Sequence, residues 1–176
     1  MKKLVALVLV LCGFALIASA NQAASGARIG DSLVLELKDQ HDQTVAINEQ
    51  TNLILFAAGK STSALMSKTL EDLPPTTLKD KKAIYVADIS GMPSFITKMV
   101  AIPKMQKRPY TIAILRDEAQ SKLFPQKDDA ITIIKLKSGK VTEINFVTKQ
   151  EEITKALQKI LQSECPKTRH SLKNFL

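Results

Sequence analysis

The sequence is poor in the side chains that most often carry redox, metal and nucleic-acid chemistry. Its 176 residues include two cysteines, two histidines and no tryptophan, and aromatic residues make up 5% of the chain. So few aromatic side chains offer little for nucleic-acid bases to stack on, and we expect no nucleic-acid partner. Zinc and copper sites need several nitrogen or sulfur ligands, which His41 and the distant His170 do not supply. We therefore expect no metal site and no cofactor.

The first twenty residues have the pattern of a secretory signal peptide. Lys2 and Lys3 precede an apolar run from Leu4 to Ile17, and Ala18-Ser19-Ala20 fits the small-residue rule for cleavage. The run is shorter than the roughly 20 apolar residues that span a bilayer. We predict cleavage after Ala20 and a bacterial periplasmic location. The alternative is an uncleaved anchor, the one case in which we expect contact with a membrane.

Cleavage would change both the charge and the cysteine content of the chain. Without Lys2 and Lys3 the net charge falls from +8 to +6, a basic excess that suits an anionic membrane surface or an acidic partner. Cys12 would be lost; it follows the bulky Leu11 and does not fit a lipid-attachment signal. Cys165 would then be alone, which excludes an intramolecular disulfide. It is either an exposed thiol or the site of an intermolecular disulfide.

One domain is expected between two irregular ends. The small and polar residues 21–28 predict a flexible leader, residues 29–163 the domain, and residues 164–176 a basic tail without periodicity. At the start of the domain, Leu33, Leu35 and Leu37 alternate with other residues, as in a strand with one buried face. A turn over residues 39–43 and a strand over 44–47 complete a hairpin.

The stretch from Asn52 to Leu73 is the centre of the predicted domain. Residues 53–58 form an apolar run that predicts a strand covered on both faces. The polar turn over residues 59–62 then begins an amphipathic helix that Pro74-Pro75 ends. We expect Ser61 or Thr62 to accept hydrogen bonds from the free N–H groups at the start of this helix.

The rest of the chain alternates between strand and helix patterns. A helix with apolar side chains begins after Pro93, Pro103 bends or ends it, and a short helix runs through Leu123 and Phe124. Ser138-Gly139 predicts a hairpin turn. This order predicts an α/β domain with a mixed central sheet, an N-terminal hairpin and helices on both faces. The other predicted elements are strands over residues 83–89, 110–115, 130–137 and 140–147, and a final helix over 149–163.

Several of these segments resemble the redoxin branch of the thioredoxin superfamily. Gly30-Asp31 followed by residues 37–40 resembles the redoxin opening, residues 52–58 its first central strand, and residues 133–141 its C-terminal hairpin. The resemblance covers residues 29–161 and implies a thioredoxin-like, three-layer fold. More faintly, the loop over residues 58–62 is similar to that of the exported YtfJ group. That group implies a thioredoxin-like fold without the redox pair and without a settled activity.

The sequence departs from the redoxin pattern at the positions that carry the chemistry. Counted from Phe56 as the family counts, the first cysteine position falls on Ser61 and the second on Ala64. Thiol exchange requires a thiolate at a helix N-terminus, and a serine hydroxyl stays protonated. The family's cis-proline would fall near Ala130, where we expect a trans bond instead. Dithiol chemistry is therefore not expected at this site.

Other patterns allow a functional and a structural interpretation. Gly59 to Thr62 imitates the end of a phosphate-binding loop, but Ile54 stands where that motif requires glycine, so a helix cap is favoured over an anion site. Met92, Met99 and Met105 suit either a copper carrier or core filling, and core filling is favoured.

The carboxylate pairs and the candidate nucleophile also favour a structural interpretation. Asp117-Glu118 and Asp128-Asp129 are expected to be solvated loop residues, because an acid/base pair needs side chains that converge in a pocket. Ser61 lacks a neighbouring histidine base in the sequence. No catalytic constellation emerges, and an enzymatic function is not expected.

We predict an exported thioredoxin-like binding or accessory module without dithiol activity, whose partner is a periplasmic protein or small ligand. The alternatives are a redox protein that uses Cys165, or an exported copper carrier. The candidate binding edge comprises Lys60, Ser61, Thr62, Asp128, Asp129 and Ala130.

Overall fold

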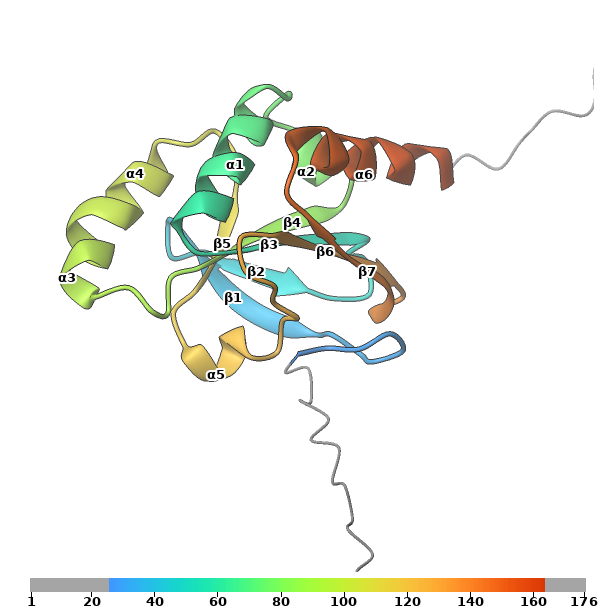
Figure 1. Ribbon diagram of the computed structural model, residues 1–176, viewed down its shortest axis with the longest axis horizontal. Helices are drawn as coiled ribbons and strands as arrows, with labels where there is room; N and C mark the ends of the chain where they lie inside the picture. Colours follow the sequence, from blue (N-terminus) through green and yellow to red (C-terminus); the bar gives the residue numbers. More distant parts are fainter. Residues whose placement is uncertain (1–25, 164–176) are drawn as a thin grey trace, which may run out of the picture.

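A computed structural model describes the backbone of residues 26–163 and the side chains of residues 26–159 (Figure 1). The predicted signal peptide and the basic tail lie outside these residues. The strands are β1 (Leu35–Asp39), β2 (Thr44–Ile47), β3 (Leu53–Ala58), β4 (Ala83–Asp88), β5 (Ile112–Leu115), β6 (Ile131–Lys137) and β7 (Lys140–Val147). The helical elements are α1 (Lys60–Glu71), α2 (Thr77–Asp80), α3 (Ser94–Ile96), the π-helical η1 (Thr97–Ala101), α4 (Ile102–Gln106), α5 (Glu118–Ser121) and α6 (Gln150–Ser163).

The strands form one mixed sheet in the order β2-β1-β5-β4-β3-β6-β7. Helical crossovers connect β3, β4 and β5, which are therefore parallel, whereas tight turns give the antiparallel pairs β1–β2 and β6–β7. Ser138 and Gly139 have φ angles of 50° and 73° between β6 and β7. Both values are positive, as a type I′ turn requires, and the predicted hairpin is confirmed.

Two hydrophobic layers lie on opposite faces of the sheet. Successive side chains of a strand point to opposite faces, so Leu53 and Leu55 of β3 join one layer while Ile54 and Phe56 join the other. Helices α1, α2, α4 and α6 cover the first face, and α5 lies over the second (Figure 1). The prediction of a mixed sheet with helices on both faces is confirmed. The two faces of β3 are both covered, which is why its sequence is an unbroken apolar run.

The helical connection between β4 and β5 is irregular at Pro103. Proline has no N–H to donate to the carbonyl of Met99, four residues earlier. The preceding turn widens into η1, in which the N–H of Ile102 reaches back five residues to the carbonyl of Thr97. Pro103 then lies in the first turn of α4. The predicted break at Pro103 is thus a change of helix type.

The apolar face predicted for this connection is the clearest error of the sequence analysis. Met105 and Ile102 pack against the core, but Met92 and Met99 are exposed. The interpretation of all three methionines as core filling is therefore wrong for two of them. Helical periodicity identified an apolar face correctly, but no described element covers the part of that face before α4.

Element boundaries differ from the prediction by a few residues. β5 begins at Ile112 instead of Tyr110, and α5 ends at Ser121, before the predicted Leu123 and Phe124. The charged run over residues 79–82 overlaps α2, a short helix that was not predicted and that buries Leu78. The backbone N–H of Ala27, in the segment predicted as a leader, donates to the carbonyl of Leu123 at 2.8 Å.

Among the residues that the structure describes, no helix combines the length and apolar composition needed to cross a membrane.

Candidate functional site

The candidate site begins where β3 passes into α1. Gly59 is the N-cap residue, with φ of 99°, a conformation that glycine adopts without steric cost. No side chain caps the helix, so the prediction that Ser61 or Thr62 would do so is wrong. The helix begins at Lys60, which places both residues inside its first turn. The Thr62 hydroxyl instead donates backwards to the carbonyl of Ala58 at 2.7 Å.

Ser61 contacts a loop that is distant in the sequence. Its hydroxyl donates to Oδ1 of Asp129 at 2.9 Å. Asp129 has φ of 53°, the left-handed conformation that Asp tolerates better than most residues. The loop over residues 125–130 is held to β6, because the hydroxyl of Thr132 donates to the carbonyl of Pro125 at 2.7 Å. The start of α1 and this loop therefore form one continuous surface.

The structure divides the six residues of the predicted binding edge into two groups. Lys60, Ser61, Asp128 and Asp129 are exposed, whereas Thr62 and Ala130 are buried at 2% and 5% exposure. Thr62 and Ala130 therefore cannot present their side chains to a partner; they anchor the two segments that carry the others. Ala64, at the second predicted cysteine position, is exposed on α1. No peptide bond in the described residues is cis, and the bond before Ala130 is trans as expected.

A polar network that the sequence did not reveal supports the same end of the sheet. Asp88 ends β4 directly beside Ala58 of β3, and the hydroxyl of Ser121 donates to its carboxylate. Gln126 donates to the Ser121 hydroxyl at 2.8 Å. The network thus connects β4, α5 and the loop that leads to Asp129. Asp88 is 33 positions from Ser121, and Gln126 lies in an irregular loop, so the three residues form no periodic pattern in the sequence.

The carboxylate pairs have separate roles. Asp117 is the N-cap of α5 and accepts from the N–H of Ala119 at 2.9 Å, and Glu118 pairs with Lys122. Asp129 accepts from Ser61, while Asp128 is exposed beside it. Neither pair converges in a pocket.

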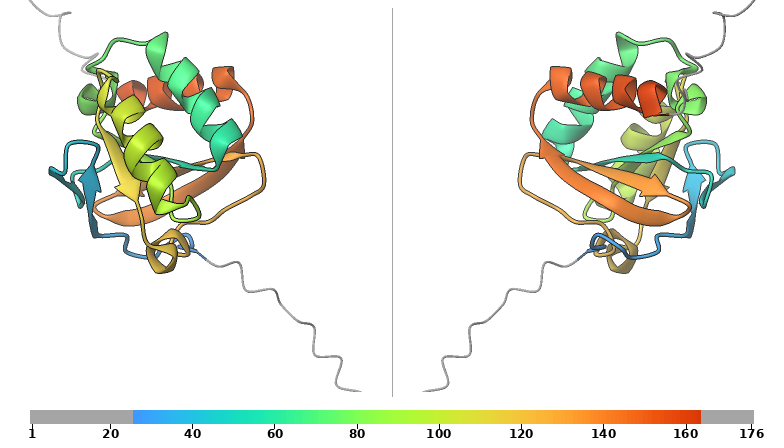
Figure 2. Two further views of the ribbon diagram at one scale, coloured as in Figure 1. Left: turned by 90° about the vertical axis from the view of Figure 1, so that its left-hand side faces the viewer. Right: turned by 90° about the vertical axis from the view of Figure 1, so that its right-hand side faces the viewer.

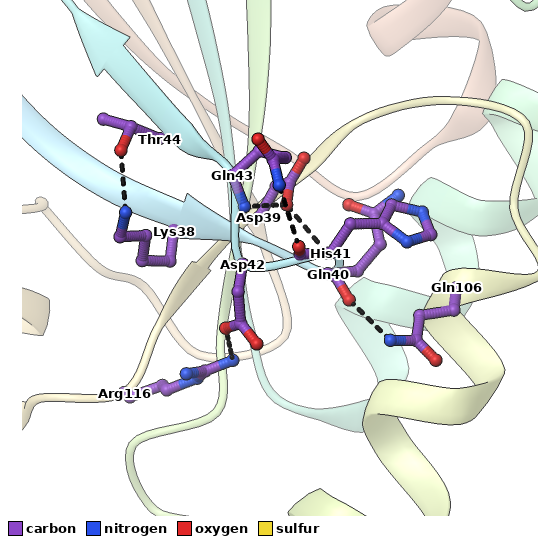
Figure 3. Close-up of polar contacts among 9 residues, drawn as sticks. All are labelled: Lys38, Asp39, Gln40, His41, Asp42, Gln43, Thr44, Gln106 and Arg116. Atoms are coloured by element: carbon purple, nitrogen blue, oxygen red, sulfur yellow. Dashed lines mark hydrogen bonds and ion pairs between the residues drawn. The ribbon is translucent and has the colours of Figure 1, made fainter.

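The turn between β1 and β2 is an ordered polar cluster (Figure 3). Oδ1 of Asp39 accepts from the backbone N–H groups of His41 and Gln43, at 2.7 and 2.9 Å. Asp42 pairs with Arg116 at 3.2 Å. The turn was predicted, and His41 is exposed in it. The burial of Gln40 at 3% exposure was not predicted.

The described residues hold no group of three or more His, Cys, Asp or Glu side chains that suits a metal ion. His170 and Cys165 lie outside the described residues. The methionines proposed for copper have different environments, since Met92 and Met99 are exposed and Met105 packs against the core.

Two surface hollows lie away from the Ser61–Asp129 contact. One, of about 310 Å³, runs along β1 and β5, and the other, of about 420 Å³, lies beside residues 26–33. Neither is lined by Lys60, Ser61, Asp128 or Asp129. The candidate edge is thus separate from both hollows.

Two tyrosines lie beneath α1. Tyr85 on β4 is 2% exposed; its burial raises the pKa of its phenol well above the ordinary value, an effect that hydrogen bonding with Ser63 only partly offsets. The hydroxyl of Tyr110 is buried and has no hydrogen-bond partner among the described residues.

The raised pKa of Tyr85 predicts a loss of stability in alkali. The stability that this raised pKa gives is complete below the ordinary tyrosine pKa of 10.0 and is lost as pH rises from there towards the folded-state pKa. One proton released only on unfolding changes the free energy of unfolding by about 1.4 kcal/mol per pH unit. Urea titrations at several pH values above 10.0 give the free energy of unfolding as a function of pH. We expect its fall with rising pH to be less steep in Tyr85→Phe than in the native protein, by about 1.4 kcal/mol per pH unit. Equal slopes in the native protein and in Tyr85→Phe would contradict the assignment.

Comparison with family models and with curated proteins finds no match to the sequence. Solved structures do match. The peroxidoxin BcpB from Mycobacterium tuberculosis superposes with a TM-score of 0.55 at 13% identity, over 80% of this chain and 99% of its own. A putative thioredoxin from Neisseria meningitidis gives 0.55 at 14% identity, over 83% and 99%. A putative thiol:disulfide interchange protein DsbE from Chlorobium tepidum gives 0.53 at 16% identity, over 78% and 98%.

The chain has the thioredoxin-like fold. The alignment with this chain includes nearly the whole length of each of the three neighbours, so the match extends over the sheet and its helices. The fold expected from residues 29–161 is therefore confirmed. At 13–16% identity the likeness concerns the fold, and the chemistry must be argued from the residues of this chain.

Proposed function

We propose that this thioredoxin-like protein is exported and acts as a binding or accessory module without dithiol chemistry. The contact between Ser61 and Asp129 carries the proposal. At the position where the redoxin resemblance expects the reactive thiolate, a hydroxyl donates to a carboxylate at 2.9 Å. Ala64 offers only a methyl group at the second position. At the position that carries the reactive cysteine in redoxins, this hydrogen bond therefore joins α1 to the loop over residues 125–130.

The proposed binding surface consists of Lys60, Ser61, Asp128 and Asp129. All four are exposed, and the segments that carry them are held by the buried Thr62 and Ala130. A surface that is already ordered loses little conformational entropy on binding. Small ligands are usually enclosed in a concave site, and neither of the hollows described above lies at this surface. These features favour a protein over a small ligand as the partner.

The pattern of residues 1–20 supports export, and the acidic and basic side chains of the surface suit a polar partner in the periplasm. The proposal includes no metal and no cofactor. The alternative is a redox protein whose single cysteine, Cys165, forms a disulfide with a partner. The two functions differ in what they require: the first needs Lys60 and Asp128, and the second needs the thiol.

Photo-crosslinking in the exporting cell would test the surface. A photoreactive side chain in place of the exposed Lys127 lies next to Asp128. Lys60→Glu with Asp128→Lys exchanges two charges, keeps the net charge and leaves the Ser61–Asp129 bond intact. We expect the native surface to give one crosslinked adduct with its partner. The charge exchange should reduce the yield of this adduct about tenfold, because like charges then face each other across the interface. The adduct is measured by mass spectrometry.

A matched exchange provides the control. Lys79→Glu with Asp80→Lys on α2 alters two exposed residues before β4, at the opposite end of the parallel strands. It should leave the adduct unchanged, and so should Cys165→Ser. Equal losses from both exchanges would refute the proposed surface. Loss of the adduct in Cys165→Ser would favour the redox alternative.

A further inference from the structure

A cluster of apolar side chains is exposed on α3, η1 and the turn before them, and it shares no residue with the proposed binding surface. Phe95 and Met99 are 68% and 64% exposed, and both lie in a helical connection whose later residues pack against the core. Single exposed apolar residues are ordinary on proteins, whereas several on one short segment indicate an interaction site. We call this cluster the α3–η1 patch. Its members are Met92, Phe95, Ile96, Met99 and Val100.

The segment of the chain that carries the α3–η1 patch is basic. Residues 89–116 contain five basic side chains and no Asp or Glu. Arg108 pairs with Glu71 and Arg116 with Asp42. Among the described residues, no ion pair engages the other three, Lys98, Lys104 and Lys107, and all are exposed. An apolar cluster with flanking lysines is complementary to a surface that is both apolar and anionic.

The α3–η1 patch lies at one end of the molecule. Figure 1 shows α3 at the extreme of the long axis, and in the left view of Figure 2 α3 and α4 face the viewer. Neither of the two hollows described above is lined by residues 92–100. A partner helix or peptide usually needs a groove for its side chains, whereas a lipid surface deforms around a protruding segment.

We propose that the α3–η1 patch binds the surface of anionic membranes. The apolar side chains insert at the boundary between headgroups and acyl chains, while Lys98, Lys104 and Lys107 contact anionic headgroups. A second copy of the chain is less suited, because it would bring the same lysines into contact. The sequence predicted membrane contact only for an uncleaved signal peptide; here the contact belongs to the folded domain.

Vesicle co-sedimentation tests the proposal with the full chain in its exported form. Binding is expected to vesicles of phosphatidylglycerol and phosphatidylcholine, to decrease with salt, and to be weak for phosphatidylcholine alone. Phe95→Asp with Met99→Asp should reduce the partition about tenfold or more, since charges replace two inserting side chains. Lys98→Glu with Lys104→Glu should also reduce it about tenfold or more.

A control pair matches the first variant in exposure. Ile29 and Val34 are 69% and 64% exposed, but lie next to β1. Ile29→Asp with Val34→Asp should leave vesicle binding unchanged, and unfolding curves should show that every variant folds. The proposal is wrong if the native protein does not bind anionic vesicles. It is also wrong if the aspartate pair at positions 95 and 99 and the control pair at positions 29 and 34 reduce vesicle binding equally. A dimer that Phe95→Asp with Met99→Asp dissociates would instead assign the patch to a second copy, and would also overturn the proposal.

Discussion

A Phe124→Ala variant should lose about 3–5 kcal/mol of unfolding free energy. Phe124 is fully buried, and its ring stacks on Phe56 of β3 with centroids 4.8 Å apart and planes inclined by 7°. The second face of the sheet has little helical cover, because α5 has a single turn. Phe124, three residues after the end of α5, therefore supplies apolar cover that α5 itself does not, and its removal leaves a cavity that small movements cannot fill.

Urea unfolding of Phe124→Ala and Leu123→Ala would test this prediction. Leu123 is adjacent but 45% exposed, so its truncation should cost less than about 0.5 kcal/mol. The carbonyl of Leu123 that accepts from Ala27 belongs to the backbone and stays in both variants. Similar losses in the two variants would show that the core of the second face does not depend on the aromatic pair.

A double-mutant cycle would separate the contact between the rings from their burial. Phe56→Leu, Phe124→Leu and the double variant should give a coupling free energy of about 0.5–1.5 kcal/mol for the stacked pair. The same variants report on the candidate site, because Phe124 immediately precedes the loop over residues 125–130. We expect Phe124→Ala to weaken the Ser61–Asp129 contact as well, through loss of order in this loop.

The elements that were predicted correctly have their evidence within a few residues. β3 is an apolar run between polar segments, and a run of that length in an α/β order indicates a strand covered on both faces. Ser138-Gly139 specifies its hairpin through backbone preference alone. With these segments in place, the order of elements determined the mixed sheet.

The errors arose where burial depends on the rest of the fold. Phe95 and Met99 have helical spacing, which identifies an apolar face but not whether another element covers it. Thr62 was predicted as a cap and a contact residue, and a helix start at Lys60 turned its side chain inward. A difference of two or three residues in the position of the N-cap is enough to change the role of a side chain.

The candidate site could be predicted only in part. The redoxin resemblance placed Ser61 and residues 128–130 at one edge, and the structure joins them through the bond to Asp129. No pattern in the sequence indicated that Ser121 and Gln126 support this edge through Asp88. Such bonds join residues more than thirty positions apart or in irregular loops, and no periodicity reports them.

Gln40 is a buried polar side chain whose loss should lower the stability of the protein strongly. β1 pairs with β5 at Lys38 and Asp39, and the side-chain amide of Gln40 continues this ladder. It donates to the carbonyl of Tyr110 and accepts from the N–H of Ile112, both at 2.8 Å. The amide thus bonds to β5 as the backbone of a neighbouring strand would. The Gln40 side chain is 3% exposed, so water cannot take over its hydrogen bonds to β5.

Gln40→Leu should therefore lose about 2–4 kcal/mol of unfolding free energy, because two buried backbone groups lose their partners at about 1–3 kcal/mol each. Gln106→Ala removes one bond of 2.9 Å to the backbone carbonyl of Gln40 and should cost about 0.5–1.5 kcal/mol. Urea titrations of both variants measure the difference. A loss in Gln40→Leu no greater than in Gln106→Ala would mean that the side-chain ladder contributes little.

Gln40→Glu distinguishes the loss of the donor from the loss of packing. The new carboxylate has nearly the shape of the amide, but in its ionised form it faces the carbonyl of Tyr110 without a hydrogen to donate. Burial favours the protonated acid, so its pKa in the folded state should lie above that in the unfolded state. The variant should thus come closest to native stability in acid and lose stability as pH rises towards neutrality. Gln40→Leu has no group to titrate, so its deficit relative to the native protein should stay constant over the same range.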